Sequence, residues 1–69
     1  MIEVFKTNVQ EELHANNILK LLLQQFPHHK INFDLEDCDK ILRIEGANLL
    51  TETVVMTVEQ TGFNCRLLE

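Results

Sequence analysis

Apolar and polar residues alternate in four short segments of the chain, and this alternation predicts four strands. The segments are 2–7, 31–35, 42–44 and 63–68. A period of two places successive side chains on opposite sides of a strand, so each segment is expected to bury one face. Acidic residues at 36–39 join the second and third segments, which predicts a hairpin.

Between these strands, two segments have apolar residues at helical spacing. The first begins at Asn8, stops before Pro27 and carries a stripe made of Ala15, Ile18, Leu19, Leu22 and Phe26. Asn8 followed three positions later by Glu11 is typical of a capping box, in which the carboxylate bonds the amide of the capping residue. A second helix is expected between a cap at Asn48 and a left-handed terminus at Gly62.

The resulting order, βαββαβ, predicts one α+β domain over residues 1–69 with a ferredoxin-like sandwich fold. Two helices with single apolar stripes must cover one face of a four-stranded antiparallel sheet, and right-handed crossovers give the strand order 4-1-3-2. Three connections then meet at one end: the loop after the first strand, the hairpin at Cys38 and the turn at Gly62. We expect any site to lie there.

Composition and charge narrow the classes of function. Six Lys and Arg stand against eleven Asp and Glu, for a net charge of −5. Phosphate backbones and anionic lipids attract cationic proteins, so neither nucleic acid nor membrane is an expected partner. No apolar run approaches the roughly 20 residues of a membrane span, and a cytoplasmic protein is expected. The sequence has no Ser and only two Gly, which argues against serine nucleophiles, phosphate loops and an enzyme.

Three segments have a distinctive apolar spacing: 31–36 (INFDLE), 42–46 (LRIEG) and 58–65 (VEQTGFNC). In this spacing the chain resembles the heavy-metal-associated domains of copper chaperones and of metal-pumping ATPases. The resemblance spans nearly the whole chain. It implies the ferredoxin-like fold, an ancestry in metal homeostasis and a metal loop after the first strand.

The metal loop departs from the family's pattern. The family's Met-x-Cys-x-x-Cys falls here on Val9, Glu11 and His14, so both thiolates and the supporting Met are absent. Copper(I) is a soft ion that selects thiolates, whereas a carboxylate is a hard ligand. We therefore expect no tight binding of Cu(I).

Glu11 and His14 admit two interpretations. Three residues apart at the start of a helix, they share a face and can together contribute two ligands to a divalent ion, with others supplied by a partner or by water. Alternatively, Glu11 provides the carboxylate of the capping box, and its negative charge interacts favourably with the positive end of the helix dipole. No metal is then involved.

The remaining candidate ligands suggest structural roles. Asp37, Cys38 and Asp39 are interpreted as a solvated acidic turn, separated from the first strand by the third. Cys65 is expected in the core as a small hydrophobe, and the two cysteines, about 14 Å apart on opposite edges, cannot form a disulfide, which needs about 7 Å. His28 and His29 are predicted to be surface residues at the other end.

The sheet face without helices is the last candidate site. If Ile2 and Val4 point inward, then Phe5, Ile41 and Leu68 point outward and form a small apolar centre bordered by Arg43 and Arg66 in a polar rim. Such a patch suits contact with a protein partner or with a second copy, although scattered exposed apolar residues are also ordinary on a protein surface.

Overall fold

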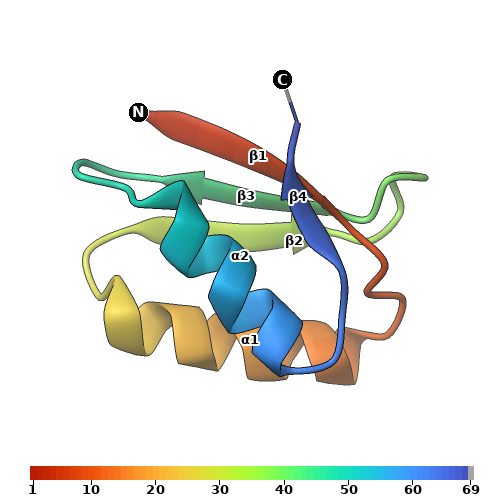
Figure 1. Ribbon diagram of the computed structural model, residues 1–69. Coiled ribbons are helices and arrows are strands. Elements are labelled where there is room, and N and C mark those ends of the chain that lie inside the picture. The colour runs from red at the N-terminus through yellow and green to blue at the C-terminus, as the bar shows by residue number, and fades with distance from the viewer. Residues whose placement is uncertain (69) are drawn as a thin grey trace.

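All six predicted elements are present in the computed structural model, which describes residues 1–68. Along the chain they are β1 (Ile2–Thr7), α1 (Glu12–Gln25), β2 (Lys30–Asp34), β3 (Ile41–Glu45), α2 (Thr51–Gln60) and β4 (Cys65–Leu67). The strands form one antiparallel sheet in the order β2-β3-β1-β4, and both helices lie on one side of it (Figure 1). The predicted ferredoxin-like sandwich is confirmed. No helix within residues 1–68 covers the other face, which we call the uncovered sheet face.

The apolar stripe of α1 holds this helix against the sheet. Ala15, Ile18 and Leu22 are its buried residues, at the three- and four-residue steps that keep side chains on one face. Phe26 closes the last turn by donating its N–H to the carbonyl of Leu22 at 2.8 Å, and it is itself buried. Pro27 has no N–H with which to extend the helix, so the predicted stop is confirmed.

The two ends of α2 differ in how well local signals predicted them. Gly62 has φ 97°, a left-handed conformation that favours glycine, and its N–H bonds the Glu59 carbonyl at 3.0 Å. This end is as predicted. At the other end the N-cap is Leu50, which makes no side-chain cap bond. Asn48 lies two residues earlier with φ 55° in a bend, so the prediction that it caps α2 is wrong.

The side chains of β1 point the opposite way from the prediction. Phe5 is 0% exposed and lies directly across from Leu42 on β3 and Leu67 on β4. Ile2 and Val4 therefore point to the uncovered sheet face, because successive side chains alternate. The prediction that Phe5 belongs to an exposed patch is wrong.

The reason lies at the end of β1, where Lys6 and Thr7 face opposite sides. In the predicted arrangement the ammonium of Lys6 would enter the core, where an unpaired charge is very costly. In the structure this ammonium is outside, 3.5 Å from the carboxylate of Asp39. Thr7 takes the inward position, and its buried hydroxyl donates to the Lys40 carbonyl at 2.6 Å and accepts from the Val9 N–H at 3.2 Å.

The core between the sheet and the helices is almost entirely aliphatic, as the composition indicates. Its buried residues are Phe5, Val9, Ala15, Ile18, Leu22, Phe26, Leu42, Ile44, Leu49, Val54, Val58 and Cys65. Phe5 and Phe26 are the only aromatic members of this set. Because a close-packed core tolerates little change in volume, the position of Phe5 constrains β1 and its two neighbours, β3 and β4.

A close contact at the opposite end of the domain fixes His29. Its Nε2 lies 2.8 Å from the Ala47 carbonyl, and its ring centroid is 5.1 Å from that of Phe26. A Cβ built on Gly46 would lie 2.3 Å from Cδ2 of His29, so only glycine allows this approach. His28 is exposed as predicted, whereas His29 is half-buried and was wrongly predicted to be a surface residue.

Replacing Phe5 by Ala should destabilise the domain far more than replacing its neighbour Val4 by Ala. Phe5→Ala removes a fully buried ring, which costs about 3 to 5 kcal/mol, whereas Val4 is half-buried on the uncovered face and its truncation should cost about 1 kcal/mol or less. Guanidinium unfolding of the two variants measures both values. A greater loss for Val4→Ala would show that β1 has the alternation first predicted.

Candidate functional site

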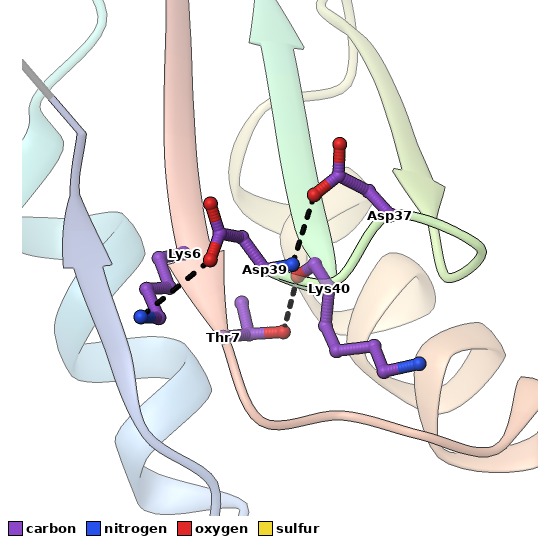
Figure 2. Close-up of polar contacts among 5 residues, drawn as sticks. All are labelled: Lys6, Thr7, Asp37, Asp39 and Lys40. Carbon is purple, nitrogen blue, oxygen red and sulfur yellow. Dashed lines mark hydrogen bonds and ion pairs between the residues drawn. The ribbon is translucent and has the colours of Figure 1, made fainter.

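Three connections meet at one end of the sandwich, and hydrogen bonds tie them together. The N–H of Thr7, at the end of β1, donates to the Asp39 carbonyl in the β2–β3 hairpin at 3.1 Å. The N–H of Asn64, before β4, donates to Oδ1 of Asn8 at 2.7 Å. The hairpin therefore contacts the end of β1 directly, and the prediction that the third strand separates the two is wrong. Figure 2 shows the ion pair and hydrogen bonds around this contact.

Glu11 occupies the N-cap position of α1, but its carboxylate caps nothing. The side chain is exposed and makes no cap hydrogen bond, while the backbone carbonyl accepts the N–H of Ala15 at 3.1 Å. Asn8, the expected partner in a capping box, bonds Asn64 instead. The capping-box interpretation of Glu11 is therefore wrong, and the carboxylate lies unbonded at a helix N-terminus.

His14 packs against the turn that precedes β4. Its ring is half-buried, with its centroid 5.1 Å from that of Phe63 and the two planes inclined at 45°. Within residues 1–68, Glu11 and His14 belong to no group of three ligand atoms close enough to share an ion. The structure thus gives this pair two potential ligands, and the prediction that they bind a divalent metal stays a prediction.

Asp37, Cys38 and Asp39 bring one ligand atom each within 4.8 Å of one another. Hydrogen bonds inside the hairpin account for part of this closeness, because Oδ1 of Asp37 accepts the N–H of Asp39 at 2.8 Å. The Asp39 carboxylate also faces Lys6, as Figure 2 shows. An exposed turn with an internal hydrogen bond and a cationic neighbour agrees with the structural role predicted for these residues.

The two cysteines are free and lie in contrasting surroundings. Cys38 is exposed in the hairpin, whereas Cys65 is buried at the start of β4. Burial, together with the weaker influence of the Glu59 carboxylate, raises the pKa of the Cys65 thiol from 9.0 to about 12. Its burial makes Cys65 a core residue, and its raised pKa disfavours the thiolate that a nucleophile or a metal ligand requires.

The uncovered sheet face presents aligned rows of side chains from all four strands. One row is Asp34, Ile41, Lys6 and Arg66, and the next is Asn32, Arg43, Val4 and Leu68. Leu68 lies just beyond β4, where its N–H bonds the Val4 carbonyl at 2.9 Å. A third row at the end of the sheet is Lys30, Glu45 and Ile2. Of the residues predicted for this exposed patch, Leu68 is on this face and half-buried, Ile41 is on it but only 8% exposed, and Phe5 is replaced by Val4.

Comparison with known proteins identifies the fold. Neither a protein-family profile nor a curated protein matches the sequence. Among solved structures, the chain is similar to a copper transporter domain from yeast, Ccc2a, determined in solution in its apo and Cu(I)-loaded states. The match has a TM-score of 0.84 and 16% sequence identity, and it covers 99% of this chain and 94% of the yeast domain.

No helix in residues 1–68 has the length and hydropathy needed to span a bilayer.

Asn8→Ala should destabilise the fold more than Glu11→Ala. The first variant loses the bond to the Asn64 N–H, worth about 1 kcal/mol, whereas the second removes an exposed side chain without a cap bond and should cost less than about 0.5 kcal/mol. The change in the free energy of unfolding is measured from the urea midpoint of each variant, provided that the m-value stays constant. A capping role for Glu11 would reverse this order.

Cys65 should make the stability of the domain fall at alkaline pH. Its folded-state pKa of about 12 lies above the ordinary 9.0, so between these values the unfolded chain loses a proton that the folded chain keeps. The stabilising contribution is therefore fully present below pH 9 and is lost as the pH rises toward 12. The free energy of unfolding, measured by urea from pH 8 to about pH 11 under reducing conditions, should fall more steeply for the wild type than for Cys65→Ala. Parallel curves would contradict the assigned shift.

Proposed function

We propose that this chain is a non-catalytic domain of metal-homeostasis ancestry that acts by contacting another protein and does not hold Cu(I) tightly in its β1–α1 loop. The observation that carries the proposal is the pair Glu11 and His14. In the family that the sequence resembles, these positions are the two cysteines of the metal loop, and here they offer a carboxylate and an imidazole. The fold shared with a copper transporter domain from yeast supports the ancestry.

No other thiol compensates for the two missing from the loop. Cys65 is buried and its raised pKa keeps it protonated, which disfavours ligation because a metal binds the thiolate. Cys38 lies in the acidic hairpin, where its near neighbours are carboxylates. Cu(I) prefers two soft ligands, and neither thiol has a soft partner in the β1–α1 loop.

The surface supports a binding role over a catalytic one. Two open hollows of about 470 Å³ each lie on it, one between α1 and β2 and the other beside Lys6 and Arg66. The first is lined by Glu12, Ala15, Asn16, Leu19 and residues 32–36, which include no cysteine, serine or histidine. The second includes Cys65, whose thiol stays protonated. The Thr7 hydroxyl in the second hollow already donates to the Lys40 carbonyl, so it is not an activated nucleophile.

The second candidate function is the binding of a divalent metal ion. It is favoured by the carboxylate of Glu11, which has no hydrogen bond to the helix N-terminus. Its exposed carboxylate makes no cap bond, and His14 follows three residues later on the same helix. A carboxylate and an imidazole suit zinc or nickel better than Cu(I). Water or a partner would then supply the other ligands, since a stable zinc site needs about four.

Cysteines introduced at positions 11 and 14 should create Cu(I) affinity in the loop. The two proteins compared both carry Cys38→Ala and Cys65→Ala, so that only the loop ligands differ. In competition with a chromogenic Cu(I) chelator, we expect the protein that keeps Glu11 and His14 to retain no metal and the one with Glu11→Cys and His14→Cys to retain about one equivalent, because two thiolates then lie at the start of α1.

Retention of Cu(I) by the protein with Glu11 and His14 intact and both native cysteines removed would overturn the proposal. The same background separates the second candidate when Zn(II) is titrated and amide NMR shifts are followed. Saturable shifts at residues 11–14 that disappear in His14→Ala would support a divalent-metal site. If no amide signal shifts, the divalent-metal candidate is rejected and the interaction role is the remaining proposal.

A further inference from the structure

We infer that the uncovered sheet face docks an acidic segment of a partner protein, with arginine side chains binding carboxylates around an aliphatic centre. This inference names the partner class for the interaction role proposed above and rests on that role. It follows from how charge is distributed over the fold, from the alignment of like charges across β1 and β4, and from the apolar residues between them.

Cations are concentrated on this face in a protein that is acidic as a whole. The chain has six Lys and Arg and a net charge of −5. Four of the six cations point to the uncovered sheet face: Lys6, Lys30, Arg43 and Arg66. Asp34 and Glu45 alternate onto the same face, and the Asp39 carboxylate reaches it at Lys6. Four cations against three carboxylates leave this face slightly positive, whereas the rest of the described domain is negative.

Two of these cations are directly opposed. Lys6 on β1 pairs in register with Arg66 on β4, and like charges directly opposite one another destabilise a sheet. Arg43 adds a third positive charge, because it pairs with Val4, two residues from Lys6 on the same side of β1. Lys6 already has an anionic neighbour, because the Asp39 carboxylate lies 3.5 Å from its ammonium, so Arg43 and Arg66 are the cations left for a ligand.

Neither Arg43 nor Arg66 has an ion-pair partner within residues 1–68. Both side chains are exposed. Two exposed guanidinium groups without an ion-pair partner among the described residues are suited to a ligand that supplies negative charge. Arginine binds carboxylates through two parallel hydrogen bonds, which provides both strength and orientation.

Apolar residues lie between these cations. Val4, Ile41 and Leu68 occupy the first two rows. Ile41 is on this side of the sheet, outside the core cluster, but at 8% exposed it offers little surface. The accessible apolar surface comes from the half-buried Val4 and Leu68 and from Ile2, which is 56% exposed in the end row. An apolar centre with a charged rim is the general anatomy of a protein-binding patch.

Other occupants of this face fit less well. A second copy docked face to face would bring two sets of cations together, which costs free energy. Single-stranded nucleic acid needs aromatic side chains on which to stack bases, but Phe5 and Phe33, the phenylalanines within the strands, lie on the helix side. An acidic protein segment with aliphatic residues complements both the charge and the apolar centre.

NMR titration with a defined probe tests the inference. The probe is a short blocked peptide of glutamates and aspartates around a central pair of leucines. Amide shifts should concentrate on β1, β3 and β4, and added salt should weaken binding. Arg43→Glu and Arg66→Glu should each weaken the affinity about tenfold. The matched control Lys20→Glu, which makes the same charge change on an exposed position of α1, should alter it less than about twofold.

Three results would overturn the inference: no shifts on this face, equal affinity for Arg43→Glu and Lys20→Glu, or equal binding of a peptide with lysine at each acidic position. Tighter binding of oligothymidylate, or of vesicles containing phosphatidylserine, would also overturn it. Circular dichroism of each variant serves as the control for folding. We expect unchanged spectra, because both arginines are exposed. The Cu(I) competition tests the β1–α1 loop, whereas the peptide titration tests the uncovered sheet face. A failure of the proposed function and a failure of this inference are therefore distinguishable.

Discussion

The rest of the structure depends on the packing of Phe5 in the core. β1 is a central strand that pairs with both β3 and β4, and Phe5 lies between Leu42 and Leu67 on the helix side. Because side chains alternate, this one placement also sends Lys6 to the opposite face and Thr7 into the interior. The core, the tie between β1 and the hairpin, and the charge of the uncovered sheet face all follow from it.

The topology could be predicted from the sequence because the spacing signals of successive elements agree with one another. Alternation in the strands and a three- to four-residue step in α1 allow one compact arrangement, and Gly62 marked the end of α2 correctly through local chemistry alone. The direction of β1 was harder to predict. Its apolar residues fall on both alternations, with Ile2 and Val4 on one and Phe5 on the other. The position of Lys6 was the signal that could have decided between them.

The end of the domain that carries the candidate loop illustrates where local rules fail. Asn8 and Glu11 have the spacing of a capping box, but the Asn8 side chain bonds Asn64, far away in the sequence. A tertiary contact of this kind leaves no local pattern, so the sequence could not show that Glu11 would be left without a bond. The alignment of Lys6 with Arg66 was hidden for the same reason, because it depends on which strands become neighbours.

The bond between Asn8 and Asn64 has a kinetic implication for how this domain assembles. It connects residues 56 apart in sequence, and β4, which follows it, has only three residues. Closing so long a loop is entropically slow, and a short edge strand offers few contacts in return. We therefore expect β4 to join the sheet late in folding and to detach first in the native state, with faster amide hydrogen exchange than β1 or β3. The edge of the uncovered sheet face that carries Arg66 and Leu68 would then form and open with β4, while Arg43 stays in place on β3, so the docking surface would have one lasting side and one transient side.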